Sequence, residues 1–259
     1  MARNPRELRA FYDALTPTSA RRLHAILRQA FQDALDHGEV ERNPCDLARP
    51  RKPRAPEKLI PTPTETEKIV IAAEEEDPLW GLFLNFTATV GTRRGETCAL
   101  RWEDVDFAAH RIHIRRSICK GVNGPTEITL PKNGRERSLL VGREFFEQVE
   151  PFGHHAGWIF SGGSRGARSR AGKHPWHPDW PGHRFATLMR RLALPYTLHS
   201  LRHFVATQLL ARGLPVTQVA RFLGHRDPSV TMNLYANHIV DDVQRLMAEA
   251  AASLFHRSP

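Results

Sequence analysis

The chain of 259 residues is long enough for one large domain or for one domain with a smaller companion. Hydrophobic residues make up 41% and charged residues 25%, a composition typical of globular proteins that excludes a largely disordered chain. The 37 Lys and Arg exceed the 28 Asp and Glu, and the formal net charge of +9 favours a polyanionic partner, nucleic acid ahead of membrane.

Two helices are predicted at the start of the chain. Apolar residues at the helical spacing i, i+3, i+4, i+7 cover Thr18–Gly38, and a shorter helical pattern covers Arg6–Leu15. Prolines then recur between Pro44 and Pro63 at a density that excludes helix and strand. The chain therefore leaves regular structure after its second helix.

The proline-rich stretch is also basic. Its cationic residues are Arg49, Arg51, Lys52, Arg54 and Lys58. Proline and positive charge together are typical of a semi-rigid linker. We therefore predict a partial helical domain at residues 1–48, a linker at 49–60 and a larger domain at 61–259.

The larger domain begins with two predicted helices. The first covers Thr64–Glu76, with Thr64 as N-cap and Glu67 three residues later. The second covers Leu79–Val90, and its mostly apolar composition indicates that it is buried.

Strands are predicted next. Arg111–Ser117 alternates apolar and polar residues, and Glu127–Leu130 and Glu136–Val141 form two further strand patterns. Asn133-Gly134 between the last two is a strong hairpin signal, so we expect these two strands to pair with each other. From about Arg143 onward helical patterns dominate. The fold class predicted is α+β, mainly α, with a small antiparallel three-stranded sheet.

Positive charge is concentrated between Ser161 and Arg226. This stretch has eleven Lys and Arg against a single acid, Asp179, and so carries about +10. Because a solvated surface normally interleaves both signs, a one-sided stretch of this length favours a surface that faces phosphate groups. The expected DNA contacts of the stretch and the linker are Arg51, Lys52, Arg54, Arg165, Arg168, Arg170 and Lys173.

The cysteines and the first residues of the chain indicate its cellular compartment. Cys45, Cys98 and Cys119 form no CxxC pair and no disulfide-framework spacing, which favours a reducing environment. Charged residues rather than an apolar core follow Met1, so we expect no signal peptide. No apolar run approaches the length of a membrane span. The prediction is a cytoplasmic protein without a membrane partner.

Four segments of the larger domain, followed by a tyrosine, carry residues suited to phosphoryl transfer. In chain order they are Thr89-Val-Gly-Thr-Arg93-Arg94-Gly-Glu96, Pro131-Lys132-Asn133-Gly134, His199-Ser-Leu-Arg202-His203 and Leu223-Gly224-His225, with Tyr235 ten residues further on. Their content and order resemble the tyrosine recombinase (phage integrase) family, whose catalytic domain is marked by Arg, Lys, His-x-x-Arg, His or Trp, and Tyr. The resemblance covers roughly Ile60–Pro259.

The resemblance implies a DNA breaking and rejoining enzyme with Tyr235 as nucleophile. Attack by tyrosine on phosphorus needs a proton acceptor, because forming phenolate from a group of pKa near 10 costs about 4 kcal/mol at pH 7. It also needs cations for the charge that builds on the phosphate oxygens. Arg93 and Arg202 suit that task, since planar guanidinium groups bind phosphate bidentately.

The remaining roles are implied by the family alone. Lys132 donates the proton to the leaving 5′ oxygen, His199 helps to move the proton of Tyr235, and His225 hydrogen-bonds a phosphate oxygen. Glu96 and His203 support the catalytic groups. The covalent 3′-phosphotyrosyl link conserves the bond energy, so neither ATP nor a metal or other cofactor is expected.

Two assignments have competitors within the sequence. Arg94 is the alternative to Arg93, and otherwise is expected to be a surface or DNA-backbone contact. Lys120 is the alternative to Lys132. A metal site at His199 and His203, four residues apart, is disfavoured because Ser200 stands where the helical zinc motif has Glu and because Arg202 would repel a cation.

Residues near the two ends of the chain indicate how it binds DNA and neighbouring protomers. Thr18–Arg42 resembles the closing helix of the family's core-binding domain, but few residues precede it, so that domain looks truncated. After Tyr235, apolar residues from Val243 to Leu254 form a helical stripe. The resemblance implies that this helix docks on a neighbouring protomer in a tetramer on double-stranded DNA, and the alternative is that it packs on its own domain. The rival interpretations are a type IB topoisomerase and a decayed, non-catalytic DNA-binding protein.

Overall fold

The computed structural model describes residues 4–52, 59–121, 126–132, 134–152, 156–162, 174–229 and 231–232. The chain divides into two compact units, Met1–Glu57 and Lys58–Pro259, which are taken separately below. Within the described ranges, each helix is either too short or too polar to cross a membrane.

The first unit contains two helices, as predicted. α1 (Pro5–Asp13) and α2 (Pro17–Asp36) both have proline in their first turn, and Asn4 and Thr16 cap their first backbone amides. A single 3-10 turn, η1 (Pro44–Asp46), packs against both helices. The small core of the unit consists of Leu8, Tyr12, Ala20, Phe31, Cys45 and Ala48.

The second unit begins with α3 (Pro63–Glu76), whose predicted cap was wrong by two residues. Thr62, not Thr64, is the N-cap, and its hydroxyl and the Glu65 carboxylate complete a capping box. The sequence offers the Thr-x-x-Glu spacing in two registers. Pro63 favours the earlier one, because proline is well suited to the first position of a helix.

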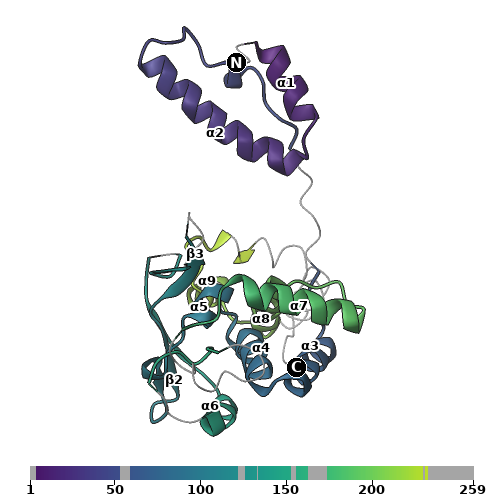
Figure 1. Cartoon of the computed structure of the whole chain (residues 1–259), viewed down its shortest axis with the longest axis vertical. Coiled ribbons are helices and arrows are strands. Elements are labelled where there is room, and N and C mark those ends of the chain that lie inside the picture. Colours follow the sequence, from purple (N-terminus) through teal and green to yellow (C-terminus); the bar gives the residue numbers. More distant parts are fainter. Residues whose placement is uncertain are drawn as a thin grey trace, which may run out of the picture. The chain divides into compact units, whose positions relative to one another are not determined.

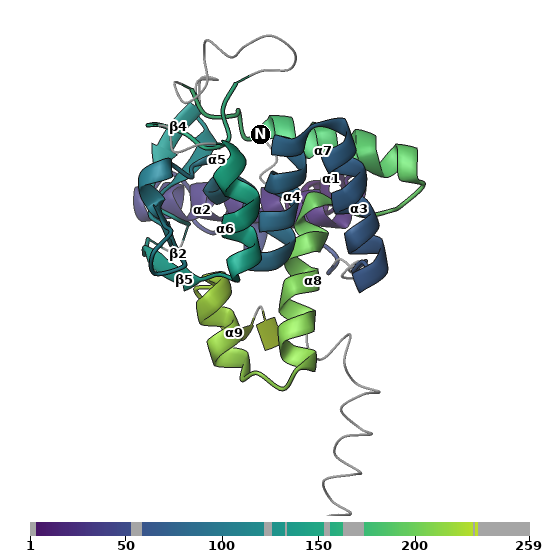
Figure 2. The same cartoon turned by 90° about the horizontal axis from the view of Figure 1, so that it is seen from below.

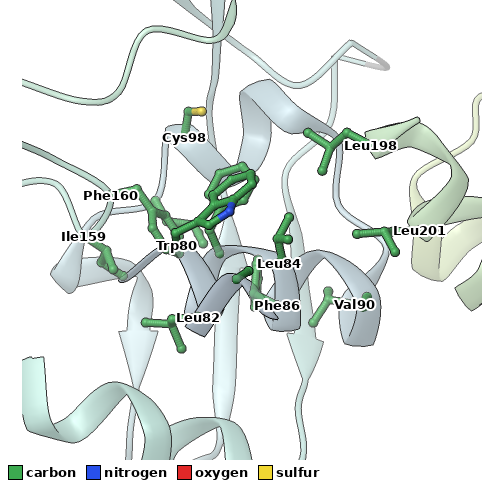
Figure 3. Packing of buried hydrophobic residues seen from close by; sticks show 14 of the residues in the cluster. Trp80, Leu82, Leu84, Phe86, Val90, Cys98, Ile159, Phe160, Leu198 and Leu201 are labelled. Carbon is green, nitrogen blue, oxygen red and sulfur yellow. The ribbon is translucent and has the colours of Figure 1, made fainter. Parts of the chain in front are cut away.

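The core of the second unit forms around α4 (Pro78–Val90), which is buried along most of its length, as predicted. Figure 3 shows Trp80, Leu84 and Phe86 of this helix beside Phe160 and Leu198 from distant parts of the chain. In both Figure 1 and Figure 2, α4 lies between α3 and the strands. The segment that follows α4 therefore begins at the end of a helix that is buried in the core.

The remaining helices are mostly short, and most follow the strands. They are α5 (Arg94–Cys98), η2 (Trp102–Asp104), α6 (Arg143–Val149), η3 (Glu150–Phe152), α7 (Asp179–Leu192), α8 (Leu198–Ala211) and α9 (Val216–Leu223). α8 packs against both α4 and α9, and α5 packs against α4. α8 and α9 lie side by side in Figure 2.

Two small antiparallel sheets stand where one was predicted. β1 (Val105–Asp106), β2 (Arg111–Ile114) and β5 (Arg137–Leu140) form a three-stranded sheet in the order β1-β2-β5. β3 (Ser117–Lys120) and β4 (Thr126–Thr129) form a separate pair. The fold class is confirmed, but the predicted strand pairing is not.

The hairpin expected across Asn133-Gly134 was wrong. Gly134 does close a turn, with φ of +70° and its amide 2.6 Å from the Pro131 carbonyl oxygen. The turn joins strands of different sheets, however, because β4 pairs back with β3 and β5 pairs with β2. A local turn signal does not specify which strands pair across it.

The single strand predicted at Arg111–Ser117 is in fact interrupted. The guanidinium groups of Arg115 and Arg116 both bind the buried carboxylate of Asp104, at 3.3 and 2.9 Å. Consecutive residues of a regular strand point to opposite faces, so two neighbours that reach one carboxylate fit an interruption of the strand. β2 ends at Ile114, and β3 begins at Ser117.

Candidate active site

Arg202 is a buried cation in the core of the second unit. Its residue is 2% exposed, and its Nη1 and Nη2 donate to the backbone carbonyls of Gly91 and Leu223, the second at 2.8 Å. Burial, followed by repulsion from Arg93, lowers the pKa of Arg202 to about 9. The guanidinium therefore stays charged at neutral pH in a place where an anion would stabilise it.

The backbone carbonyls of two glycines, Gly91 and Gly224, accept hydrogen bonds from Arg202 and Arg93. Gly91 ends α4 with φ of +68°, and a Cβ there would lie 2.5 Å from Cδ2 of Leu223. Gly224 ends α9 with φ of +72°, and a Cβ there would lie 2.9 Å from Nη1 of Arg137. The left-handed backbone and the close approaches explain why both motif segments contain glycine.

Arg93 reaches the same turn from the other side. Its Nη2 donates to the Gly224 carbonyl at 2.8 Å, next to the Leu223 carbonyl that accepts from Arg202. Its Nη1 binds Oε1 of Glu96 at 2.8 Å, and its backbone amide donates to Oε2 at 3.0 Å. The end of α9 thus aligns two arginines that are more than a hundred residues apart in the sequence.

Glu96 is a fully buried carboxylate at the centre of this cluster. Its side chain is 0% exposed and binds Arg137 as well as Arg93, with 2.6 Å between Oε2 and the Nη2 atom of Arg137. Burial alone would raise the pKa of Glu96, but the two arginines, Arg137 above all, hold it below the ordinary value. Glu96 is therefore ionised and orients Arg93, and its supporting role in catalysis stays a prediction.

Arg137 was missed by the sequence analysis. It lies on β5, two residues before the buried Leu139, and its side chain is only 10% exposed. An arginine in phase with the buried face of an alternating strand was the signal that could have identified it. That signal acquires a meaning only once β5 is paired with β2 and turned toward Glu96.

His225 follows the turn directly. Its backbone amide donates to the Ala220 carbonyl at 2.8 Å, and its Nδ1 lies 2.7 Å from Oγ1 of Thr231, which is fully buried. The hydrogen bond at Nδ1 sets the orientation of the ring. Thr231 has no distinctive sequence signal, and its role emerges only from this contact.

Two cavities connect the predicted residues. A cavity of about 790 Å³ is lined by Arg93, Lys120, Lys132 and His199 among others. A second cavity, of about 1300 Å³, is lined by Lys132, Arg137 and His225 among others. Both lysines weighed from the sequence line the first cavity, and Lys132 also lines the second, so the choice between Lys120 and Lys132 stays a prediction.

His199 and His203 lie on neighbouring turns of α8. Their rings are perpendicular, with centroids 4.5 Å apart. Among the residues that the structure describes, no group of three or more His, Cys, Asp or Glu could hold a metal ion. The two histidine rings therefore contact each other on α8, the helix that also carries Arg202.

Two of the chain's three tyrosines are described, and both have pKa values above the ordinary value. The Tyr196 hydroxyl donates to Oε2 of Glu65 at 2.9 Å, and burial together with that carboxylate raises the pKa of Tyr196. Burial and the neighbouring Cys45 raise the pKa of Tyr12 in the first unit. Tyr235 lies outside the described residues, so its position relative to the cluster stays a prediction.

The predicted DNA contacts are described only in part. Arg94 pairs with Asp179 at 3.3 Å on a half-exposed surface, and Arg51 lies 3.7 Å from Asp13. Lys52 is exposed. The other expected contacts, Arg54, Arg165, Arg168, Arg170 and Lys173, lie outside the described residues, as does the apolar stripe from Val243 to Leu254.

The basic stretch is less one-sided in space than in sequence. Arg184 pairs with Asp77 at 3.0 Å, and Arg191 pairs with Glu76 at 2.7 Å. Arg202, which was counted in the same stretch, is buried. The carboxylates that neutralise these arginines come from a distant segment, so counting charges along the chain overestimated the surface that faces phosphate.

Comparison with known proteins places the chain in a family. The sequence pattern of the phage integrase family matches residues 62–241. A tyrosine recombinase XerC-like protein of Caldanaerobacter subterraneus subsp. tengcongensis is 26% identical over 273 residues, covering 90% of this chain and 65% of that protein. The ICEBs1 integrase of Bacillus subtilis is 24% identical over 245 residues, covering 91% of this chain and 65% of that protein. The chain thus spans about two thirds of the length of these curated relatives.

Solved structures share the fold. A Tn1549 transposon integrase in complex with transposon right end DNA has a TM-score of 0.77 at 18% identity, covering 96% of this chain and 85% of that chain. A lambda integrase tetramer bound to a Holliday junction has a TM-score of 0.67 at 18% identity, covering 88% and 65%. At this level of identity the likeness establishes the fold and not the activity.

Proposed function

Because the chain belongs to the phage integrase family, we propose that it is a site-specific DNA recombinase that cleaves and rejoins strands through a 3′-phosphotyrosyl intermediate. The observation that carries the proposal is the alignment of Arg93 and Arg202 on adjacent carbonyls, Gly224 and Leu223. A guanidinium has five N–H donors, so these bonds orient both groups and leave donors for a phosphate. His225 follows directly and completes a site suited to one phosphate group.

The proposed reaction needs only side chains of the chain and DNA. The hydroxyl oxygen of Tyr235 attacks phosphorus and transfers its proton to His199, while the bond from phosphorus to the 5′ oxygen breaks. Lys132 protonates that departing oxygen. The 5′-hydroxyl of another strand then attacks the phosphotyrosine and gives its proton to Lys132. The bond from phosphorus to Tyr235 breaks, and His199 returns its proton to the tyrosine oxygen, which restores Tyr235 and rejoins the DNA. Preorganised cations at the phosphate are worth about 100- to 1000-fold each in rate.

The domains and partners follow from the same proposal. Residues 61–259 form the catalytic domain, residues 49–60 the linker and residues 1–48 a partial clamp on double-stranded DNA. The division of the chain between Glu57 and Lys58 supports this arrangement. The complexes formed by the similar integrases favour a tetramer on DNA, held by the helix after Tyr235. The proposed compartment is the cytoplasm.

The proposal is tested by capturing the covalent adduct. The full chain is incubated with a library of duplexes that carry one nick beside a randomised core, since a nick close to the scissile bond lets the short fragment with the released 5′-hydroxyl diffuse away. We expect an SDS-resistant protein–DNA species with the wild type and none with Tyr235→Phe, which loses only a hydroxyl.

The outcomes separate the alternatives. DNA binding by both proteins without any adduct would support a non-catalytic DNA-binding protein. An adduct combined with relaxation of supercoiled plasmid and no strand exchange would support a topoisomerase. An adduct with Tyr235→Phe equal to that of the wild type contradicts the assigned nucleophile.

A further inference from the structure

The arginine cluster contains one more cation than the family chemistry assigns. Arg93 and Arg137 bind the carboxylate of Glu96, and Arg202 lies close enough to interact with it electrostatically, so the three arginines and one carboxylate carry a net charge of about +2. A phosphodiester brings one negative charge and acquires a second as the nucleophile attacks. The net charge of the cluster thus matches the two negative charges of the transition state, and Arg137 supplies one of the positive charges that it needs.

Arg137 is the principal partner of Glu96. Its guanidinium approaches both carboxylate oxygens, Nη2 to Oε2 at 2.6 Å and Nη1 to Oε1 at 3.3 Å. Arg93 makes only one side-chain bond to the same carboxylate, at 2.8 Å. The fork geometry of the Arg137 pair is the stronger of the two, because bidentate arginine–carboxylate pairs are favoured in both geometry and energy.

Arg137 also supports the turn that holds the arginines. Its guanidinium packs so closely under Gly224 that a Cβ on that residue would lie 2.9 Å from Nη1. The Gly224 carbonyl accepts from Arg93, and His225 is the next residue. Arg137 thus touches both the anion that orients Arg93 and the backbone that holds it.

A buried carboxylate cannot remain ionised without a compensating cation. If Arg137 were absent, Arg93 would be the one cation among the described residues still bonded to Glu96, and its charge would be directed at the carboxylate rather than at DNA. The cluster would fall to a net charge of about +1, held mainly by Arg202.

We propose that Arg137 is a positioning residue for strand cleavage, which neutralises Glu96 and so leaves the charge of Arg93 available to the phosphate. This inference rests on the function proposed above. It assigns Arg137 an effect on the chemical step, with little effect on DNA affinity, because many other phosphate contacts determine that affinity.

The test uses the nicked duplex that the wild type captures from the library. Single-turnover adduct formation at saturating DNA, and the Kd for the same duplex, are measured for Arg137→Met, Arg137→Lys and the double variant Arg137→Met/Glu96→Gln. We expect Arg137→Met to slow adduct formation about 100-fold at little change in Kd. Arg137→Lys should lie between that variant and the wild type, since lysine keeps the charge and loses the fork.

The double variant is decisive. Removing both members of a buried pair is far less costly than removing one, so Glu96→Gln should recover most of the rate that Arg137→Met loses. A double variant as slow as Arg137→Met overturns the proposal, since a merely structural or phosphate-contacting arginine would not be rescued in this way. A loss of affinity in Arg137→Met at unchanged rate also overturns it.

A matched exposed pair serves as the control. Arg143 and Glu147 on α6 are 3.0 Å apart, with side chains 77% and 60% exposed. Arg143→Met and Arg143→Met/Glu147→Gln remove the same groups from the surface. We expect neither variant to change the rate, because exposed pairs contribute little.

Thermal unfolding without DNA makes the inference testable apart from the proposed function. Arg137→Met should lower the Tm by about 6 °C or more, and Glu96→Gln in the same chain should reverse most of that loss. If the wild type forms no adduct with any duplex, the proposed function fails. Equal Tm values for Arg137→Met and the double variant would instead show that Arg137 is not the counter-charge of Glu96.

Discussion

Arginines occupy two contrasting environments in the second unit. Near the buried Glu96, Arg202 is buried and donates to the backbone carbonyls of Gly91 and Leu223, while the partly buried Arg93 and Arg137 share the Glu96 carboxylate. On the surface, Arg94 pairs with Asp179 and Arg143 with Glu147, and both members of each pair are substantially exposed. The residue type and the ion-pair distances are similar, but the surroundings differ.

The contrast determines what each arginine can do. An exposed pair contributes about 0–1 kcal/mol and exchanges partners freely, so such an arginine can turn toward a DNA phosphate at little cost. A buried arginine is held in one geometry and is costly to leave without a counter-charge, about 3–5 kcal/mol when a buried partner is removed. We therefore expect buried arginines to orient a reacting phosphate and exposed arginines to attract DNA in general.

Replacement of Arg202 should have the largest effect. Arg202→Ala removes a preorganised cation from the phosphate site, and we expect adduct formation on the captured nicked duplex to slow about 100- to 1000-fold. Arg202→Lys should recover little, since lysine lacks the planar fork that reaches both the carbonyls and a phosphate. A single-turnover rate equal to the wild type for Arg202→Ala would remove the distinction between buried and exposed arginines.

The backbone that holds Arg202 should be the next most sensitive element. Gly91→Ala combines a left-handed φ with a clash against Leu223, and we expect a loss of about 2–5 kcal/mol in the free energy of unfolding. Gly213→Ala is the matched control, because φ there is +79° and no atom lies within 4 Å of the added Cβ. It should lose only about 1–2 kcal/mol.

Urea denaturation followed by tryptophan fluorescence measures both variants. The five tryptophans all follow residue 79 in the sequence and therefore lie in the unit that contains both glycines. Equal losses for Gly91→Ala and Gly213→Ala would mean that the close approach of Leu223 to Gly91 does not constrain the site.

The corrected cap of α3 predicts a moderate effect. Thr62→Ala breaks the capping box with Glu65 and should cost about 1 kcal/mol in the free energy of unfolding. Thr64→Ala, at the position first expected to be the cap, is exposed and should change it by less than about 0.5 kcal/mol. If Thr64→Ala lost more stability than Thr62→Ala in the same urea assay, Thr64 would be the N-cap and the helix would begin two residues later.

The smallest effect on stability is expected at the exposed arginine. Arg94→Met should change the free energy of unfolding by less than about 0.5 kcal/mol. If Arg94 contacts a phosphate, the slope of log Kd against log salt should fall by about 0.9. Measurement of Kd between low and moderate salt checks this, and an unchanged slope would exclude Arg94 from the DNA contacts.

The predictable part of the site was the part encoded in local motif segments. Arg93, Arg202 and His225 stand in segments with distinctive spacing, and Gly224 within one of them reflects a backbone requirement that the sequence shows directly. The helices were predictable for the same reason, because helical periodicity and capping are local. Arg137 was not, since its role depends on the pairing of β5 with β2.

The failures share that cause. A turn does end at Gly134, but the pairing of the strands depends on where β4 and β5 find partners, and not on the turn itself. Arg184 is neutralised by Asp77 from a segment about a hundred residues away, which no charge count along the chain reveals. Strand pairing and ion pairs between distant segments are therefore what the structure adds to the motifs.

The central claim is that DNA becomes attached to one particular tyrosine beside a buried arginine cluster, and peptide mapping of the adduct tests it most directly. The chain has three tyrosines, of which Tyr12 and Tyr196 have raised pKa values and hydroxyls engaged by neighbouring groups. After nuclease and protease digestion of the wild-type adduct, mass spectrometry should find the nucleotide on Tyr235. A nucleotide on Tyr196, which lines the same cavity as Arg93 and His199, would contradict the account.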